Sequence, residues 1–368
     1  MTAVSSARLL PTDEPRCLID SDGCAHTDLG HNDDTRLPSD VVLLHLYRRM
    51  VIGRRFDAQA TALTKQGRLA VYPSSHGQDA CQVGTVAAMA DRDWLFPTYR
   101  DSVAMISRGI NPVEVLTLLR GDWHCGYDPY LHRTAPQCTP LATNTLHAVG
   151  LAHAARQAGE DTVAVAMLGD GASSEGDTHE ALNIAAVWQA PVVFVVQNNG
   201  YAISVPLAKQ SHAQSLAHKG IGYGMPGLLI DGNDAAIVYA AVSEGIARAR
   251  RGGGPTLIEG ITYRIEAHTN ADDDRRYRQS SEVTAWLAKD PIERLQKYLQ
   301  NKGILSDADI ASVREDADIR AGRLREAMNS APALDPAELF EHVYVEPTRN
   351  LRRQSRWLGE ELAAARRP

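Results

Sequence analysis

Short apolar runs alternate with amphipathic stretches through the second half of the chain. The runs TVAVAML (Thr162–Leu168) and PVVFVVQ (Pro191–Gln197) are apolar almost throughout. Strands buried on both faces have such continuous runs, because neither row of side chains meets water. The alternation therefore predicts an α/β fold with a parallel sheet covered by helices on both faces. The predicted strands are Thr162–Leu168, Pro191–Gln197, Leu228–Ile230 and Thr256–Tyr263, with helices near Thr178–Gln189 and over Asp234–Arg250.

Helical periodicity prevails on either side of this region. Ser39 is placed to cap a helix over Asp40–Gln66, which Gly67 ends. A second helix opens at Asn111, where proline follows, and stops at Gly121; proline favours the first helical turn and glycine the C-terminus. Further helices are predicted over Asn144–Gln157 and, after a polar loop at Glu266–Ser280, in charged amphipathic form over about Glu282–Asn329.

The pattern divides the chain into one large domain with two extensions. Residues 1–38 are rich in Asp, Pro, Ser and Thr without an apolar period, so we expect an extended N-terminal arm. Residues 39–345 contain every predicted strand and are expected to form the large domain, which holds the ligand-binding site. The length of 368 residues and the apolar content of 44% are sufficient for such a core. A helical tail is predicted over residues 346–368.

Charge and cysteine content argue against several classes of protein. The formal net charge is −7, whereas nucleic-acid-binding proteins usually carry a basic face. No run of 18 apolar residues occurs, so we expect no membrane-spanning helix and no membrane partner. The first residues contain several acids, which fit neither a secretory signal nor a mitochondrial leader. Five cysteines without a CxxC pair indicate reduced thiols, and we expect a cytoplasmic protein.

Two glycine-containing segments follow successive predicted strands: GDG at Gly169–Gly171 and NNGY at Asn198–Tyr201. Loops at the carboxyl ends of parallel strands face one crevice, and the intervening 26 residues suit one helix and one strand. Either segment alone is a common turn. Together they bring the Asp170 carboxylate, the Asn199 side chain and the Tyr201 carbonyl into reach of one ion. Such oxygen ligands suit Mg²⁺, with diphosphate and water oxygens completing its octahedron.

The stretch GDGASSEGDTHEALNIAAVWQAPVVFVVQNNGYAIS closely resembles the α subunits of thiamine-diphosphate-dependent E1 components of 2-oxo acid dehydrogenases. The resemblance runs from about Asp40 to Arg278, and is strongest to the branched-chain enzymes. It implies the thiamine-diphosphate-binding fold, with thiamine diphosphate and Mg²⁺ as cofactors. The family pattern implies Asp170, Asn199 and Tyr201 as metal ligands, and Gly169, Gly171 and Ala172 as neighbours of the cofactor.

Three further segments match this family. FPTYRD resembles the segment whose Tyr99 and Arg100 contact the diphosphate, and the planar fork of an arginine suits a phosphate. TPLAT resembles the loop whose Thr139 and Leu141 meet the aminopyrimidine ring. YRIEAHTNADD resembles the loop that carries the active-site histidine, which makes His268 the expected catalytic and cofactor-binding residue.

The resemblance also implies an activity and partners. An E1 component decarboxylates a 2-oxo acid and reductively acylates the lipoyl group of an E2 acyltransferase. We predict a branched-chain 2-oxo acid as substrate, with pyruvate or acetoin dehydrogenase as the alternative. In this family the carboxylate that activates thiamine belongs to a β subunit, so we expect an α₂β₂ heterotetramer. Two classes outside the family stay open: a Mg²⁺-dependent phosphotransfer enzyme that uses Asp170, and a non-catalytic binding subunit.

Overall fold

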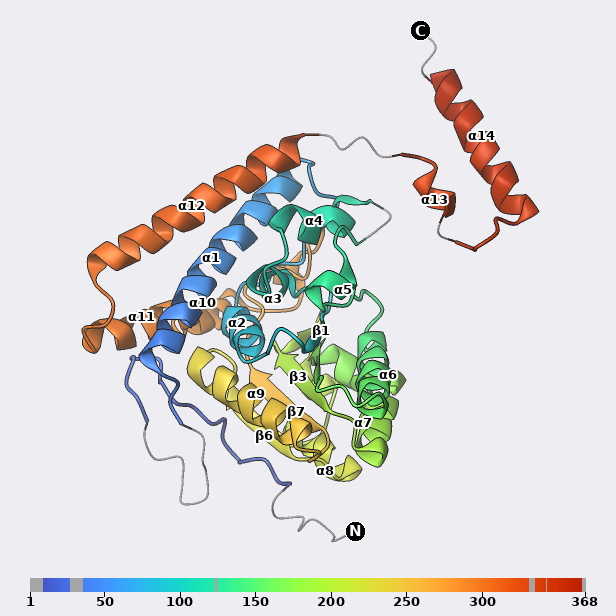
Figure 1. Ribbon diagram of the computed structural model, residues 1–368. Helices are drawn as coiled ribbons and strands as arrows, with labels where there is room; N and C mark the ends of the chain where they lie inside the picture. The colour runs from blue at the N-terminus through green and yellow to red at the C-terminus, as the bar shows by residue number, and fades with distance from the viewer. Residues whose placement is uncertain (1–8, 27–35, 123–124, 331–334, 342, 366–368) are drawn as a thin grey trace.

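A five-stranded sheet forms the centre of the computed structural model, which describes residues 9–26, 36–122, 125–330, 335–341 and 343–365 (Figure 1). All its neighbouring strands are parallel, in the order β1-β2-β3-β7-β6. The α/β class and the four predicted strands are confirmed. The first strand was not predicted, because three residues are too few to show a period. The strands are β1 (Trp94–Phe96), β2 (Ala164–Gly169), β3 (Val192–Asn198), β6 (Gly227–Asp231) and β7 (Thr256–Ile261).

The register of the sheet aligns the carboxyl ends of its strands. Gly169 of β2 lies opposite Gln197 of β3, and Asn198 lies opposite Ile261 of β7. Ile261 is in turn opposite Asp231, the last residue of β6. The loops that leave β2 and β3 therefore start side by side, as their spacing predicted.

Alternate residues of each strand enter two separate hydrophobic layers. Val193 and Val195 of β3 pack with α2 and α9, whereas Phe194 and Val196 pack with α6 and α7. Successive side chains of a strand point to opposite faces, so a strand that is apolar throughout supplies both layers. The covering helices are α2 (Asp79–Ala87) and α9 (Ala235–Arg250) on one face, and α6 (Thr143–Gln157) and α7 (Gly176–Trp188) on the other (Figure 1).

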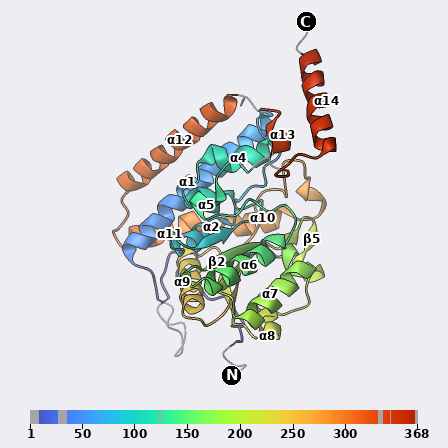
Figure 2. The same cartoon turned by 45° about the vertical axis from the view of Figure 1, so that its right-hand side comes forward.

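A further group of helices surrounds α1 (Asp40–Lys65). This helix lies along α12 (Asp307–Asn329) and also packs against α11 (Pro291–Asn301) and α3 (Ser102–Ser107) (Figure 2). The helices predicted in these regions are confirmed to within a few residues. The other short elements are α4 (Pro112–Arg120), α5 (Pro129–His132), α8 (Lys219–Tyr223), α10 (Ser280–Leu287), α13 (Glu338–Glu341), α14 (Arg349–Ala365), β4 (Tyr201–Ala202) and β5 (Val205–Pro206).

Irregular segments run along both outer strands of the sheet. Beside β6, the N–H of Arg16 donates to the Leu229 carbonyl at 3.0 Å. Beside β1, the N–H of Leu95 donates to the Arg133 carbonyl at 2.9 Å, and the Leu95 carbonyl accepts from the N–H of Ala135 at 2.8 Å. At these positions, backbone groups that face away from the sheet are already paired.

The two ends of the described chain differ in how they meet the core. The N–H groups of Leu18 and Ile19 donate to the buried Asp234 carboxylate at 2.6 and 2.8 Å, which fixes the N-terminal segment. Helix α14 buries no residue and stands apart with α13 (Figures 1 and 2). The boundaries at residues 38 and 345 stay predictions, and residues 1–8 and 27–35 of the expected arm lie outside the described residues. None of the described helices combines the length and apolar character that crossing a membrane requires.

Candidate functional site

A cavity of about 180 Å³ opens at the carboxyl ends of β2 and β3. The turn at Thr98–Arg100 and the segment that follows β7 complete its walls. Ten of the eleven residues that the sequence placed at the site line this cavity, and Thr139 does not. The convergence shows that distant motifs form one site, while the role of each residue stays a prediction. The ten are Tyr99, Arg100, Leu141, Gly169, Asp170, Gly171, Ala172, Asn199, Tyr201 and His268.

Asp170 supplies a buried carboxylate to the cavity, and the residue is only 1% exposed. It lies where β2 ends and a single 3₁₀ turn, Gly171–Ser174, begins. Its Oδ1 accepts the backbone N–H of Asn199 at 3.4 Å, and its Oδ2 accepts Nε2 of Gln210 at 2.7 Å. Burial raises the pKa of Asp170, while the hydrogen bond from Gln210 acts to lower it. A cation bound here would stabilise the ionised form.

A series of side-chain hydrogen bonds connects Asn199, which follows β3, to Gln78 at the start of α2. Oδ1 of Asn199 accepts the N–H of Tyr201 at 3.2 Å, and Nδ2 of Asn199 donates to Oε1 of Gln78 at 3.0 Å. Nε2 of Gln78 donates to Oε1 of Gln197 at 3.0 Å, and Nε2 of Gln197 donates to Oδ1 of Asp101 at 2.6 Å. Both ends of the Gln197 amide are engaged by neighbours, so it acts as a neutral link.

Two buried guanidinium groups meet at His268. Nη2 of Arg100 lies 3.1 Å and Nη1 of Arg264 lies 3.4 Å from Nδ1 of the histidine. The two arginines are 5% and 1% exposed, and the buried Nε of Arg264 has no hydrogen-bond partner among the described residues. Two cations this close repel each other in a poorly solvated site, so an anion bound here would be strongly favoured.

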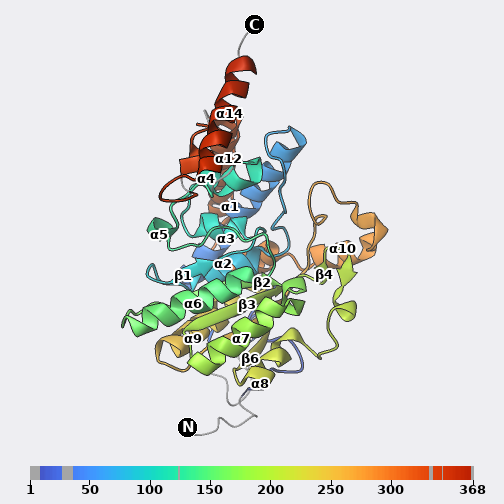
Figure 3. The ribbon, with the colours of Figure 1, turned by 90° about the vertical axis from the view of Figure 1, so that its right-hand side faces the viewer.

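Arg264 was missing from the predicted site residues. The available signal was an arginine four positions before His268, in a segment that follows a strand of the parallel sheet. Tyr201, which lines the cavity, and Tyr263, which precedes Arg264, both donate their hydroxyls to Glu282 of α10, at 2.9 and 3.2 Å. Figure 3 shows α10 beside β4 at this end of the molecule.

Burial and the two guanidiniums together keep His268 neutral. Burial, followed by the charges of Arg100 and Arg264, lowers the pKa of His268 to about 4, so its ring is neutral at pH 7. Guanidinium N–H groups can only donate, so Nδ1 must accept from them and the ring proton lies on Nε2. His268 therefore offers a neutral N–H donor at the cavity.

An anion bound between the two arginines should reverse this shift. We expect Mg²⁺ with inorganic pyrophosphate to raise the pKa of His268 by at least one unit, because negative charge stabilises the imidazolium and screens the guanidiniums. The ring resonances of His268, followed by NMR between pH 3.5 and 8 with and without pyrophosphate, measure this change. The other histidines serve as internal references. A pKa that stays near 4 in saturating pyrophosphate would show that the anion binds elsewhere.

The buried carboxylate of Asp57 helps to position the guanidinium of Arg100 through the segment at Ser74. Its carboxylate accepts the hydroxyls of Tyr72 and Ser74 at 2.8 and 2.6 Å and the N–H of Ser75 at 2.6 Å. The Ser74 carbonyl then accepts Nη1 of Arg100 at 3.0 Å. Burial raises the pKa of Asp57, and the three donors act in the opposite direction. This network orients the guanidinium before any ligand arrives.

The residues present fit a Mg²⁺-bound diphosphate. Within the described part of the chain, the buried Nε of Arg264 and Oε1 of Gln210 are an unpaired donor and an unpaired acceptor beside the cavity. Gly171 permits close backbone approach, because a Cβ there would lie 2.7 Å from the Cβ of Ala202. Within the described residues no three His, Cys, Asp or Glu side chains cluster to hold a metal. A Mg²⁺ ion here would take further ligand oxygens from the diphosphate, because it prefers octahedral coordination.

Comparison with known proteins gives consistent matches over most of the chain. A family model described as "Dehydrogenase E1 component" matches residues 47–337. The chain is 47% identical over 359 residues to "3-methyl-2-oxobutanoate dehydrogenase subunit alpha" of Mycobacterium tuberculosis (strain ATCC 25618 / H37Rv), covering 97% of each chain. It is 40% identical over 320 residues to "Pyruvate dehydrogenase E1 component subunit alpha" of Staphylococcus aureus (strain N315), covering 86% of each chain.

Proposed function

Because the chain belongs to the dehydrogenase E1 component family, we propose that it is the α subunit of a thiamine-diphosphate-dependent branched-chain 2-oxo acid dehydrogenase. The observation that carries this proposal is the convergence of one buried carboxylate, Asp170, and two buried guanidiniums, Arg100 and Arg264, on one cavity. A carboxylate for Mg²⁺ opposite cations for phosphate is the donor set that a metal-bound diphosphate requires.

Each wall of the cavity has a role in this proposal. Asp170, Asn199 and the carbonyl of Tyr201 would hold Mg²⁺, and Arg100 and Arg264 would neutralise the diphosphate. Backbone groups of the 3₁₀ turn after β2 would approach its oxygens closely. The remaining predicted contacts are Tyr99, Thr139, Leu141, Gly169, Gly171 and Ala172.

Thiamine diphosphate, when bound, supplies the electron sink for decarboxylation. The protein's part is to position the cofactor and to control protons. We assign to the Nε2–H of His268 the donation of a hydrogen bond to an oxygen of the substrate or to the incoming lipoyl group. A neutral imidazole suits this role, because it can donate without adding a third charge beside Arg100 and Arg264.

The size of the cavity supports a shared active site. Pockets that enclose a whole organic ligand usually measure about 300–1,000 Å³, whereas this cavity has about 180 Å³. It can hold a diphosphate with its metal but not a complete cofactor. We therefore propose that a β subunit covers the rest, in an α₂β₂ heterotetramer, and that the product acyl group passes to a lipoyl-bearing E2.

The substrate is proposed from the relatives and from the expected sequence pattern together. The relative at 47% sequence identity is named for 3-methyl-2-oxobutanoate, which is a branched-chain 2-oxo acid. The relative named for pyruvate has 40% sequence identity. Since extra methylenes in an apolar pocket are worth about 1–3 kcal/mol, the preference should be graded, at about 10- to 200-fold.

Reconstitution with a β subunit tests the proposal. We expect the α/β pair to decarboxylate 2-oxoisovalerate with at least ten times the kcat/KM for pyruvate, and the chain alone to turn over neither. The assay compares 2-oxoisovalerate, 2-oxoisocaproate and pyruvate side by side, with Mg²⁺ and thiamine diphosphate in excess. A preference for pyruvate would change the substrate but keep the family. Full turnover by the single chain would refute the shared site.

A further inference from the structure

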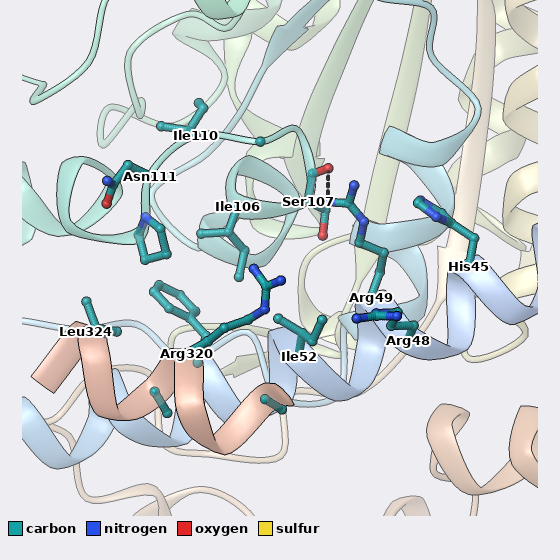
Figure 4. A pocket seen from close by; sticks show the side chains of 15 residues that line it. His45, Arg48, Arg49, Ile52, Ile106, Ser107, Ile110, Asn111, Arg320 and Leu324 are labelled. Carbon is teal, nitrogen blue, oxygen red and sulfur yellow. Dashed lines mark hydrogen bonds between the residues drawn. The ribbon is translucent and has the colours of Figure 1, made fainter. Parts of the chain in front are cut away.

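A second, larger cavity of about 750 Å³ lies between α1, α12 and the turn that joins α3 to α4. It shares no lining residue with the cavity at the strand ends. Figure 4 shows its two ends: Leu324 and Ile110 lie at one end, and Arg48, Arg49 and His45 lie at the other.

One end of this cavity is apolar. Phe56, Ile110 and Leu324 are buried residues that contribute to its wall, at 5%, 2% and 4% exposure. Ile52 and Ile106 are half-buried and lie between this end and the arginines. A wall of this kind binds hydrocarbon or an aromatic ring through burial of apolar surface.

The other end holds more positive than negative charge. Nη2 of Arg48 and Nε of Arg320 share one carboxylate, Asp316, at 2.8 and 3.0 Å. Arg49 donates Nη1 to the Ser107 carbonyl at 2.7 Å and has no carboxylate within ion-pair distance among the described residues. Of the three guanidiniums at this end, two share one carboxylate and the third has none among the described residues.

Burial and mutual repulsion both act on the pKa values of these groups. The pKa of Arg49 is lowered by burial and then by the charges of Arg320 and Arg48. The pKa of His45 is lowered by burial and then by Arg49 and Arg48. An anion at this end would relieve the repulsion, and each guanidinium keeps N–H donors for it, because it has five.

We propose that this cavity binds an amphipathic organic anion whose apolar body lies against Phe56 and Leu324 and whose phosphate or carboxylate head lies between Arg49 and Arg320. The site is separate from the proposed thiamine diphosphate site and does not depend on that assignment. Its volume lies within the range of about 300–1,000 Å³ that is usual for pockets of small organic ligands. Arginine forks match the planar or tetrahedral oxygens of such heads.

A fluorescence titration of the full chain with 8-anilinonaphthalene-1-sulfonate, an aromatic sulfonate, tests this site. We expect saturable binding that Arg320→Met weakens at least tenfold, because the variant removes one of the two guanidiniums that contact the anionic head group. Arg320 is exposed and lies on the surface of α12, so the fold should persist, which the melting temperature checks. Arg325→Met is the matched control: it removes the same charge from an exposed position on the same helix, outside the cavity lining.

Competition separates the two halves of the site. Octyl phosphate should displace the probe at concentrations where neither inorganic phosphate nor octanol does so. Equal displacement by inorganic phosphate would leave a plain anion site, and equal displacement by octanol would leave a plain apolar cavity; either result overturns the proposal. It is also overturned if Arg320→Met and Arg325→Met bind the probe alike.

Discussion

Replacing Asp170 with asparagine should weaken Mg²⁺-dependent binding of thiamine diphosphate at least 100-fold. Among the described residues that line the cavity at the strand ends, the substitution removes the only buried carboxylate, and it keeps the shape of the side chain. A 100-fold loss corresponds to about 2.7 kcal/mol, a moderate value for losing an anionic ligand of a divalent ion. Isothermal titration of the cofactor in excess Mg²⁺ measures the change.

The same variant should be at least as stable as the natural protein when no cofactor is present. Burial already raises the pKa of Asp170, which means that its ionised form is disfavoured in the folded state. Asparagine removes that cost: its Oδ1 can still accept the N–H of Asn199, and its Nδ2 can donate to Oε1 of Gln210, which has no partner among the described residues. Asp177→Asn is the control, because it removes an equal charge from α7 outside the cavity lining. Unchanged cofactor affinity in Asp170→Asn would rule out the metal assignment.

Gly77→Ala should destabilise the protein by more than about 3 kcal/mol, the range of severe backbone and packing defects. A Cβ at this position would lie 1.9 Å from the Tyr263 carbonyl oxygen, and the backbone has φ of +92°. Neither backbone can move freely, because the His76 carbonyl accepts the N–H of Ile265 at 3.2 Å. Gln78, the next residue, lines the cavity, so cofactor binding should fail together with stability.

Gly67→Ala distinguishes the clash from the strain of a positive φ. Gly67 has φ of +68°, and a Cβ there would meet nothing within 4 Å. This control should cost only about 1 kcal/mol, the penalty for a left-handed alanine. Urea denaturation of both variants gives the comparison. If Gly77→Ala is no less stable than Gly67→Ala, the predicted clash with the Tyr263 carbonyl is refuted.

The sequence predicted the carboxyl-terminal loops of β2 and β3 well, because local patterns determine them. A continuous apolar run specifies a buried strand, and a glycine-containing turn marks its end, so Asp170 and Asn199 could be placed without knowledge of the fold. The short strand β1 could not, since its three residues gain their structure from pairing with β2. Its existence depends on a partner about 70 residues away in the chain.

Gln78 and Arg264, which also line the cavity, were harder to predict than the residues at the ends of β2 and β3. Gln78 lies far from Gln197 in sequence, and only the fold brings the residue before α2 to the end of β3, where their amides meet. Arg264 follows β7 within the segment that contains His268, yet its role depends on meeting Arg100, which comes from the segment after β1. Such convergence has no periodicity, so no single stretch of sequence reveals it.

The irregular segments beside β1 and β6 have a consequence for solubility. An open sheet edge presents free N–H and C=O groups that can recruit a strand from another molecule, which is the first step of many aggregation reactions. Here Arg16 occupies donors and acceptors along β6, and Arg133 and Ala135 occupy those of Leu95 in β1. The chain thus blocks its own sheet from growing, while the carboxyl ends of the strands stay open for ligands.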